Sequence, residues 1–306
     1  MKAVICTNYG PPEVLKIQEV DRPTPKDHEV LIKILAASAH IGDTRIRKAD
    51  PLLVRLLFGM LKPKKNLILG LEVSGVIEAV GKDVQSFKPG DEVFGLTGFR
   101  GGCAEYICLP GKVEQGTGEK KGMVVLKPGH LSHEEAAVVP SGALTALKNL
   151  QKANIRSGQK VLIYGASGSL GTYAIQLAKY YGAEVTAVCS RGNFELVRSL
   201  GADQVIDYTV EDFTASETRY DIVYDAVIKS KAAQCQKILT PNGIFVNNSR
   251  LAKIEEADFL FIKSLLEDHK LKPVVDRTYA LKEIVKAHRY VDTGRKKGNV
   301  AITIGR

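Results

Sequence analysis

The stretch that decides the fold is Val161-Leu162-Ile163-Tyr164-Gly165-Ala166-Ser167-Gly168-Ser169-Leu170-Gly171. A short run of β-branched and aliphatic residues meets a turn of small residues. The turn opens directly into a helical pattern that stops at Gly182. This order of strand, turn and helix is the context in which a glycine-rich turn binds a dinucleotide. The stretch therefore predicts a βαβ unit whose helix amino terminus holds a pyrophosphate.

Each small residue of this turn has a predicted role. Ala166 allows the tight turn, Gly168 lets the backbone approach the pyrophosphate, and Gly171 lets the helix pack against the strand. The alternative is an ordinary glycine-rich turn between a strand and a helix, with no ligand. The cofactor-binding residues predicted in this segment are Ala166, Ser167, Gly168, Ser169, Leu170 and Gly171.

The end of the second strand indicates which dinucleotide binds. An NAD site usually places a carboxylate there, about twenty residues after the turn, to hold the ribose 2′-hydroxyl. Here the strand 184–189 is followed by Ser190, Arg191, Gly192 and Asn193, without a carboxylate. Hydrogen-bond donors and positive charge suit a 2′-phosphate, so we predict NADPH, held by Ser190, Arg191 and Asn193. The alternative for Arg191 is a solvated loop residue.

Composition is typical of a soluble cytoplasmic enzyme. The net charge is +9 over 306 residues, but the basic residues are scattered and form no arm, so we expect no nucleic-acid partner. Five cysteines, an odd number without a C-x-x-C pair, indicate reduced thiols in the cytoplasm. No signal peptide and no apolar run of spanning length is found, so we expect no membrane partner either.

Periodicity divides the chain into two domains. Residues 1 to about 110 show short strand patterns separated by turns, which predicts a small, partly open β-barrel. From about residue 124 strands and helices alternate, which predicts a doubly wound parallel sheet of five strands. We place the barrel at 1–123, completed by 270–306, and the dinucleotide-binding domain at 124–269. The helical stretch 44–61 interrupts the barrel, and its apolar positions Ile46, Leu52, Leu53, Leu56 and Leu57 are expected to pack as a flap on the barrel.

Three separated motifs follow one another along the chain: Gly70-x-Glu72-x-x-Gly75-Val76 with Val80-Gly81 and Gly90-Asp91; Leu131-Ser132-x-Glu134-Glu135-Ala136-Ala137 with Pro140 and Leu144-Thr145-Ala146; and Gly158-Gln159 with Leu162, Ala166-Ser167-Gly168, Gly171, Gln176 and Lys179. With these motifs the whole chain resembles the medium-chain dehydrogenase/reductase superfamily, in its zinc-free quinone oxidoreductase (zeta-crystallin-like) branch. Ser169 departs from the pattern, because the branch usually has glycine there. The resemblance implies a co-chaperonin-like small β-barrel catalytic domain beside a Rossmann domain, an α/β fold.

The resemblance implies that no zinc is bound. Zinc-dependent relatives place ligands at positions that match His40 and Leu71, and leucine cannot ligate a metal. A lone His40 does not make a catalytic zinc site, which needs three protein ligands. We therefore predict no metal site.

The resemblance also implies a reaction: hydride transfer to a quinone or to the β-carbon of an α,β-unsaturated carbonyl compound. The implied catalytic residues are His40, Tyr9 and Asp43, with His40 as a hydrogen-bond donor or a proton source. Further cofactor contacts are implied at Thr145, Tyr208 and Val227. For His40 and Tyr208 the alternative is simple packing. The expected partner is a small electrophilic substrate.

Two departures from the family pattern concern activity and assembly. Ile228 stands where relatives commonly have a glycine beside the cofactor, and isoleucine tolerates few of glycine's backbone conformations. After the strand 243–246 the next helix follows almost at once, so a sixth sheet strand is expected to be absent, which puts a homodimer in question. The alternatives to the quinone and enone reaction are an NADP-dependent alcohol or aldehyde oxidoreductase and an NADPH-binding protein with little turnover.

Overall fold

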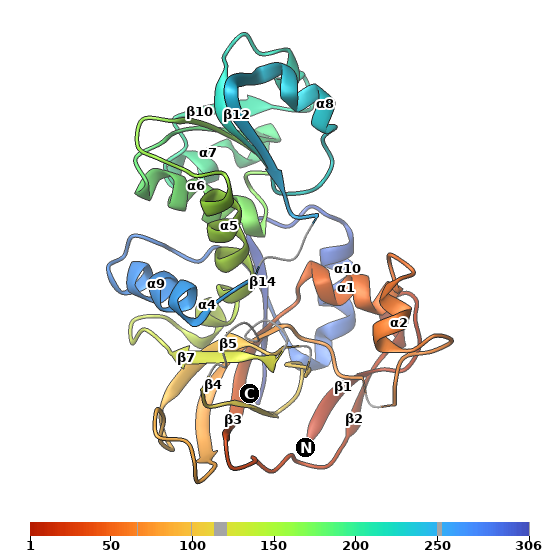
Figure 1. Cartoon of the computed structure of the whole chain (residues 1–306). Coiled ribbons are helices and arrows are strands. Elements are labelled where there is room, and N and C mark those ends of the chain that lie inside the picture. Colours follow the sequence, from red (N-terminus) through yellow and green to blue (C-terminus); the bar gives the residue numbers. More distant parts are fainter. Residues whose placement is uncertain (66, 99, 113–120, 250–252, 306) are drawn as a thin grey trace. The chain divides into compact units, whose positions relative to one another are not determined.

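The structure is a computed structural model that describes residues 1–65, 67–98, 100–112, 121–249 and 253–305 (Figure 1). The chain forms two compact units. The first comprises Met1–Ser141, Glu255–Lys263 and Val275–Arg306, and the second comprises Gly142–Ile254 and Ser264–Val274. Each unit is described by itself below.

The first unit is built on β-sheet. Its larger sheet has the order β13-β14-β3-β4-β5-β7, and β6 pairs with β3 beside this path. The remaining two strands, β1 and β2, form an antiparallel hairpin. Most strands alternate with turns and pair antiparallel, as the sequence predicts for a small barrel. Their bounds are β1 Lys2–Cys6, β2 Leu15–Glu19, β3 Glu29–Ser38, β4 Glu72–Val80, β5 Glu92–Leu96, β6 Tyr106–Pro110, β7 Met123–Leu126, β13 Val275–Ala280 and β14 Asn299–Thr303.

Helices flank the sheet of the first unit. The stretch predicted as one helix over 44–61 forms two, because the left-handed Ala49 ends the first of them. The core of the unit lies between the sheet and the apolar faces of α1 and α10, where Ile46, Ile284 and Val291 are buried. The helices of this unit are α1 Ile41–Lys48, α2 Val54–Phe58, α4 His133–Ala137 and α10 Ile284–Asp292, with short 3-10 turns η1 Pro12–Val14 and η5 Leu281–Glu283.

The second unit is a parallel sheet with the order β10-β9-β8-β11-β12. All four pairings are parallel, so the predicted doubly wound sheet is confirmed. The three inner strands, β8, β9 and β11, are largely buried, as expected of a sheet covered on both faces, whereas the edge strands β10 and β12 are only partly buried. The bounds are β8 Lys160–Tyr164, β9 Glu184–Cys189, β10 Gln204–Asp207, β11 Tyr220–Asp225 and β12 Leu239–Asn247.

The crossover helices of the second unit include α6, which follows β8 directly. Its apolar residues, such as Tyr173, Ile175 and Leu177, are completely buried. Two helices cross the boundary between the units, α5 between Ser141 and Gly142 and α9 between Lys263 and Ser264. The bounds are α5 Pro140–Lys152, α6 Ser169–Tyr180, α7 Phe194–Ser199, α8 Ala232–Cys235 and α9 Glu256–Glu267, with η2 Arg191–Asn193, η3 Phe213–Ala215 and η4 Gln236–Ile238.

Two expectations from the sequence need correction. The first unit extends to Ser141 rather than to residue 123, because β7 pairs with β5 and the capped helix α4 follows within the same unit. The flap is only partly packed: Ile46 is buried, but Leu52, Leu53, Leu56 and Leu57 are 63 to 72% exposed. Val54 and Phe58 instead hold α2 to the core, because they lie one helical turn apart on its inner side.

The sheet of the second unit ends at β12 within the part of the chain that the structure describes. β12 pairs only with β11, and α9 begins at Glu256, nine positions after β12 ends at Asn247. Residues 250–252 of this connection lie outside the described residues. Five strands of this sheet are described, and the lack of a sixth stays a prediction.

All five cysteines are free and buried. They are spread over both units, with Cys6, Cys103 and Cys108 in the first and Cys189 and Cys235 in the second. Burial raises the pKa of the Cys6, Cys108 and Cys189 thiols to about 11. These thiols are therefore protonated at neutral pH.

Candidate active site

The turn after β8 has the geometry that the sequence predicts for a phosphate-binding loop. Gly165 supplies the tight turn with a φ of 79°, while Ala166, assigned this role from the sequence, is completely buried. Gly168 is the N-cap of α6 and has no side chain to cap the helix. The amide groups of the first helical turn therefore face the end of the helix, where the helix dipole favours an anion.

Gly171 is required by close packing of the helix on the turn. A Cβ atom at this position would lie 2.3 Å from the Gly165 carbonyl oxygen and 2.6 Å from Ala166 backbone atoms. A Cβ at Gly168 would meet only the Gly165 oxygen, at 3.4 Å. The predicted division of roles is thus visible in the contacts: Gly171 serves packing, and Gly168 leaves the outer surface of the turn open.

Three of the predicted 2′-phosphate residues come together with the turn. The Asn193 amide nitrogen donates to the Ser167 hydroxyl at 3.0 Å and to the Ser190 hydroxyl at 3.1 Å. The Asn193 Oδ1 atom is buried and has no hydrogen-bond partner. Arg191 stands in the same loop, in η2, and is exposed. Hydroxyls, an unpaired amide oxygen and a guanidinium form a polar cradle that fits the phosphate and ribose of a dinucleotide.

Asp207 is a residue of this cradle that the sequence analysis missed. It ends β10 and lies opposite Cys189, the last residue of β9. Hydrogen bonds from Thr209 and then from the Arg191 backbone lower the pKa of Asp207, so it is charged at neutral pH. The carboxyl ends of parallel neighbours meet at one edge of a sheet, and this rule could have found Asp207.

The loop after β11 is organised by the buried carboxylate of Asp225. Its two oxygens accept hydrogen bonds from the backbone N–H groups of residues 227–230 at 2.7 to 2.9 Å. These hydrogen bonds hold Val227 against Gly165. A Cβ atom added to Gly165 would lie 2.5 Å from the Val227 Cγ1 atom. Ile228 follows with a φ of 56°, the left-handed region that glycine occupies without strain. The sequence expectation of a strained position at Ile228 is confirmed.

Three other predicted cofactor residues lie at the surface of the second unit. Leu170 is half-buried in the first turn of α6. Thr145 is half-buried on α5, where its carbonyl accepts a hydrogen bond from Asn149. Tyr208 is 49% exposed and lies edge-on to Tyr164, with ring centroids 6.0 Å apart. Val227, Gly165 and Tyr164 thus share one end of the sheet with the phosphate-binding turn.

His40 is the central polar residue of the first unit. It caps the amino terminus of α1, and its Nδ1 atom accepts a hydrogen bond from the Gly42 N–H at 3.0 Å. An accepting Nδ1 carries no proton, so the ring proton lies on Nε2. Nε2 is 3.3 Å from the Ser141 hydroxyl oxygen. His40 is therefore oriented as a donor through Nε2–H.

The charge state of His40 follows from its surroundings. Burial, and then the nearby Lys296 and Arg45, lower the pKa of His40 to about 3. The imidazole is neutral at pH 7, so it can donate a hydrogen bond but does not hold the extra proton of an imidazolium. Of the two roles weighed for His40, the hydrogen-bond donor fits this environment.

A buried carboxyl group, Glu72, supports the surroundings of His40 and was missed as a site residue. One oxygen accepts a hydrogen bond from the Ser141 N–H at 2.6 Å, and the other accepts from the Ser38 hydroxyl. Burial raises the pKa of Glu72 to about 7, and burial lowers that of Lys296 to about 8. Glu72 thus fixes the start of α5 and places the Ser141 hydroxyl beside His40.

The other two predicted catalytic residues have structural partners. Asp43 is completely buried, and its carboxylate accepts from the His40 N–H at 3.1 Å and from the Gly70 N–H at 2.8 Å. These bonds complete the capping box of α1, so Asp43 positions His40. The Tyr9 hydroxyl donates to the Gly59 carbonyl at 2.7 Å, which ties Tyr9 to the segment after α2.

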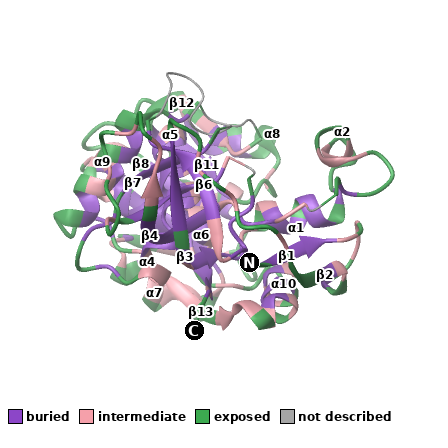
Figure 2. Ribbon diagram, turned by 90° about the horizontal axis from the view of Figure 1, so that it is seen from below, coloured by how far each residue is buried: buried purple, intermediate pink, exposed green. Residues whose placement is uncertain are grey.

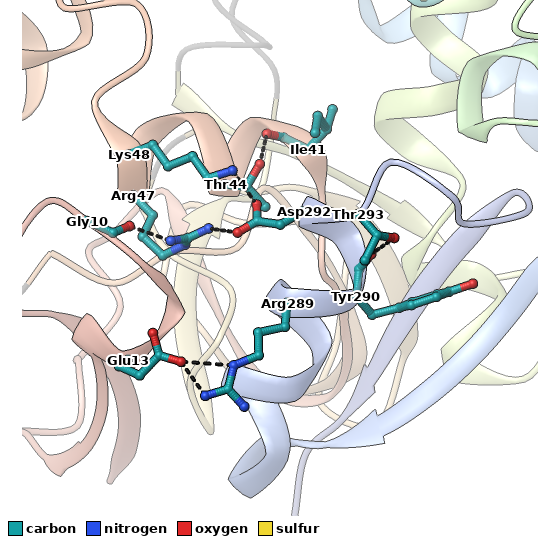
Figure 3. Close-up of polar contacts among 10 residues, drawn as sticks. All are labelled: Gly10, Glu13, Ile41, Thr44, Arg47, Lys48, Arg289, Tyr290, Asp292 and Thr293. Atoms are coloured by element: carbon teal, nitrogen blue, oxygen red, sulfur yellow. Dashed lines mark hydrogen bonds and ion pairs between the residues drawn. The ribbon is translucent and has the colours of Figure 1, made fainter.

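The carboxyl end of α1 is fixed by an ion network with α10 (Figure 3). Arg47 is completely buried and donates to the Gly10 carbonyl and, at 2.5 Å, to Asp292. Lys48 reaches the other oxygen of Asp292 at 2.8 Å. Because α1 is held at both ends, the ring of His40 is presented from a rigid element.

Metal ligands do not gather around His40. Leu71 occupies the position of a second ligand, and within the described residues no three His, Cys, Asp or Glu side chains are grouped so that they could hold a metal ion. In the same part of the chain, none of the helices is both long and apolar enough to cross a membrane.

Three family models match the chain. Residues 26–202 match the alcohol dehydrogenase GroES-like domain, and residues 169–268 and 248–302 match models described as zinc-binding dehydrogenase. The first match covers more than half of the chain. It joins the barrel of the first unit to the dinucleotide turn of the second in one family pattern.

Two curated relatives align over almost the whole chain. A 2-methylene-furan-3-one reductase of Solanum lycopersicum is 36% identical, with 99% of this chain and 79% of that protein covered. A chloroplastic NADPH-dependent alkenal/one oxidoreductase of Arabidopsis thaliana is 32% identical, with the same coverage. Both alignments extend over 327 positions, more than the 306 residues of this chain. The relatives therefore carry residues that this chain lacks.

A solved structure gives the same result for the fold. The quinone oxidoreductase of Coxiella burnetii superimposes with a TM-score of 0.88 at 30% identity and covers 100% of this chain and 99% of its own. Sequence motifs, fold, site geometry and relatives agree. The chain belongs to the medium-chain dehydrogenase/reductase superfamily of NAD(P)H-dependent oxidoreductases.

Proposed function

We propose that this protein uses NADPH to reduce quinones or α,β-unsaturated carbonyl compounds without a catalytic metal. The observation that carries the proposal is the arrangement of His40. A neutral ring with its proton on Nε2, set beside the Ser141 hydroxyl, offers hydrogen-bond donors to a carbonyl oxygen. The same superfamily position holds a zinc ligand in metal-dependent relatives, and Leu71 cannot supply the next one.

The second unit fits the proposed cofactor. Gly168 leaves the helix end open to a pyrophosphate, and Ser167, Ser190 and Asn193 form one hydrogen-bonded group beside it. Arg191 would pair with a 2′-phosphate, and the unpaired Oδ1 atom of Asn193 would accept a hydrogen bond from the ribose. Val227 and Tyr208 would border the bound dinucleotide.

When bound, NADPH supplies the hydride that the acceptor receives. The residues of the first unit would then stabilise charge on the acceptor oxygen. His40 would donate through Nε2–H, and the Ser141 hydroxyl would add a second donor. A neutral His40 with a pKa near 3 cannot deliver a proton from an imidazolium at pH 7, so the final proton would come from solvent or from another acid.

The first test is turnover. NADPH absorbance would be followed with the purified protein and a panel of small quinones, enones and aldehydes, with NADH measured in parallel. We expect oxidation with quinones or enones and a preference for NADPH. Oxidation with aldehydes alone would favour the alcohol and aldehyde alternative. Bound NADPH without turnover on any acceptor would favour a binding protein, the reading that Ile228 and the lack of a sixth strand support.

The role of His40 has its own test. His40→Ala should lower kcat by about ten- to a hundredfold, because one aligned donor is lost, and leave the NADPH dissociation constant nearly unchanged. His40→Asn should keep part of the rate, because its amide can still donate. The measurements are steady-state kinetics and NADPH fluorescence titration of the same samples. An unchanged kcat in His40→Ala would mean that His40 serves only as the cap of helix α1.

Location and assembly complete the proposal. Five free, buried thiols suit a reducing compartment, and we place the protein in the cytoplasm. A homodimer stays in question. β12 is the last described strand of its sheet, and its open edge is the surface through which two copies would pair. Fractionation of the source cells and light scattering of the purified protein test these two points.

A further inference from the structure

Among the described residues of the first unit, α2 and its flanks carry a group of exposed large apolar side chains, which we call the α2 patch. It consists of Leu52, Leu53, Leu56, Leu57, Met60 and Leu61, which are 61 to 93% exposed. Six large apolar side chains within ten residues are unusual on a water-facing surface. Contiguous exposed apolar surface of this kind marks a contact with another molecule or a membrane.

The patch belongs to a segment that is firmly attached to the unit. Val54 and Phe58, on the inner side of α2, pack against the core. The Tyr9 hydroxyl donates to the Gly59 carbonyl, and the Arg55 guanidinium lies 5.2 Å from the centre of the Tyr9 ring. Figure 2 shows α2 at the rim of the molecule in exposed and intermediate colours. The outward leucines are thus held in place by the inward contacts.

The charges beside the patch are mostly positive. Residues 50–65 contain Arg55, Lys62, Lys64 and Lys65 against a single carboxylate, the exposed Asp50. The three lysines are exposed and follow the last apolar residues directly. An apolar face bordered by lysines is the pattern of segments that lie in a membrane interface, where the apolar side chains enter the acyl boundary and the lysines meet anionic headgroups.

We propose that the α2 patch docks the protein onto the surface of a bilayer that contains anionic phospholipid. Charge complementarity favours this occupant over a second copy of the chain, because two identical patches would bring their lysines together. The inference concerns peripheral binding and is independent of the reaction. It departs from the expectation from the sequence that the protein has no membrane partner, and the vesicle experiment below decides between the two.

The test is co-sedimentation of the full chain with two kinds of vesicle, pure phosphatidylcholine and phosphatidylcholine mixed with phosphatidylserine. We expect binding to the mixed vesicles at low salt, weaker binding at high salt, and little binding to pure phosphatidylcholine. Two patch variants separate the contributions. Leu56→Glu with Leu57→Glu removes the apolar contact, and Lys62→Glu with Lys64→Glu and Lys65→Glu reverses the charge. Each should lower binding by roughly tenfold or more.

Two control variants place changes of the same kind elsewhere: one glutamate at an apolar position, against two in the leucine variant, and three reversed lysines against three. Val210→Glu alters an apolar side chain that is 83% exposed in the second unit. Lys229→Glu with Lys231→Glu and Lys237→Glu changes the net charge by the same amount, also at exposed positions. Both should bind like the unaltered protein. Thermal unfolding of every variant checks that the fold is kept, and the lysine variants keep the test valid if the double glutamate variant does not fold.

Two results would overturn the proposal. The first is failure of the unaltered protein to bind the mixed vesicles at low salt. The second is equal binding by the patch variants and the controls. If light scattering also shows that the unaltered protein is a dimer and that Leu56→Glu with Leu57→Glu is a monomer, the patch is an interface between two copies instead.

Discussion

Arg191 is the residue on which the choice of cofactor depends. It is exposed beside the group formed by Ser167, Ser190 and Asn193, and its backbone also bonds Asp207. Arg191→Ala should weaken NADPH by about tenfold or more and NADH much less, because only NADPH has a 2′-phosphate to lose the contact. Dissociation constants of the two nucleotides, measured by fluorescence, check this.

Arg198→Ala is the matched control for the cofactor test. Arg198 is an exposed arginine on α7, stacked on Phe194 at 5.5 Å, and has no predicted cofactor role. Arg198→Ala lowers the net charge by one, as Arg191→Ala does. Equal weakening of NADPH and NADH by Arg191→Ala would assign Arg191 to the surface and turn attention to Asp207, whose carboxylate suits a ribose hydroxyl.

Ile228 carries backbone strain at a position where the family commonly has glycine. Its φ of 56° is costly for a β-branched residue, and its side chain is 40% exposed, so little burial would be lost on truncation. Ile228→Gly should raise the free energy of unfolding by about 1 kcal/mol. Urea unfolding measures it. Ile228→Ala keeps a Cβ atom, so its free energy of unfolding should rise much less. An equal rise in the alanine and glycine variants would show that the isoleucine side chain beyond Cβ, and not the φ angle, destabilises the unaltered protein.

Helix α1 shows how one element combines a functional end with a structural end. His40 stands at its start, and Arg47 and Lys48 at its end bind Asp292 of α10. Removing one partner of a buried ion pair leaves the other charge without compensation. Asp292→Ala should therefore lower the free energy of unfolding by about 3–5 kcal/mol, as urea unfolding would measure.

The exposed pair in the same region provides the comparison (Figure 3). Arg289 and Glu13 also join α10 to the amino-terminal segment, but their side chains are 59% and 47% exposed. Glu13→Ala should lower the free energy of unfolding much less than Asp292→Ala does, because solvent screens an exposed pair. If Asp292→Ala and Glu13→Ala lower the free energy of unfolding equally, the burial of Arg47 does not determine how much its ion pair stabilises the protein.

The stability of the whole molecule should depend on pH through Glu72. Its pKa in the folded state, about 7, is above the usual value near 4.3, because burial favours the neutral form. The folded state thus holds the proton that the unfolded state releases. Stability from this group is complete at low pH and falls as the pH rises to about 7, by roughly 4 kcal/mol in all.

Glu72→Gln isolates this effect. Glutamine is neutral at every pH and can still accept a hydrogen bond from the Ser141 N–H. The advantage of the variant over the unaltered protein, measured by urea unfolding, should therefore grow from pH 5 to pH 8. Glu78→Gln is the control, since Glu78 is exposed and bonded to Arg22, and its pKa is lowered. The prediction is contradicted if the free energy of unfolding of Glu72→Gln and that of the unaltered protein change with pH in the same way.

At the level of the molecule, local patterns predicted the fold well. The run 184–189 is a strand with the predicted bounds, because a buried strand is visible in the sequence as a run of apolar residues. The dinucleotide turn was predicted from spacing, and its grouping with Ser190 and Asn193 follows from parallel topology. For these elements the structure expected from the local sequence is the one found in the fold.

What the sequence did not predict depends on distant contacts. Glu72, Ser141 and His40 are far apart in the chain, and only folding brings the carboxyl group to the start of α5. The leucines of α2 have helical spacing, but spacing cannot say which side has a partner. The boundary near residue 123 was misplaced because β7 is a four-residue strand whose partner, β5, lies about thirty residues earlier.

The buried cysteines have a consequence for an enzyme that meets quinones and enones. Such acceptors alkylate thiolates, so a reductase is exposed to inactivation by the compounds it consumes. Here all five thiols are shielded from solvent, and burial raises the pKa of Cys6, Cys108 and Cys189 to about 11. An electrophile in solution therefore cannot reach these sulfur atoms, and at neutral pH they are thiols rather than reactive thiolates. If quinones and enones are its substrates as proposed, we expect its thiols to resist alkylation by them.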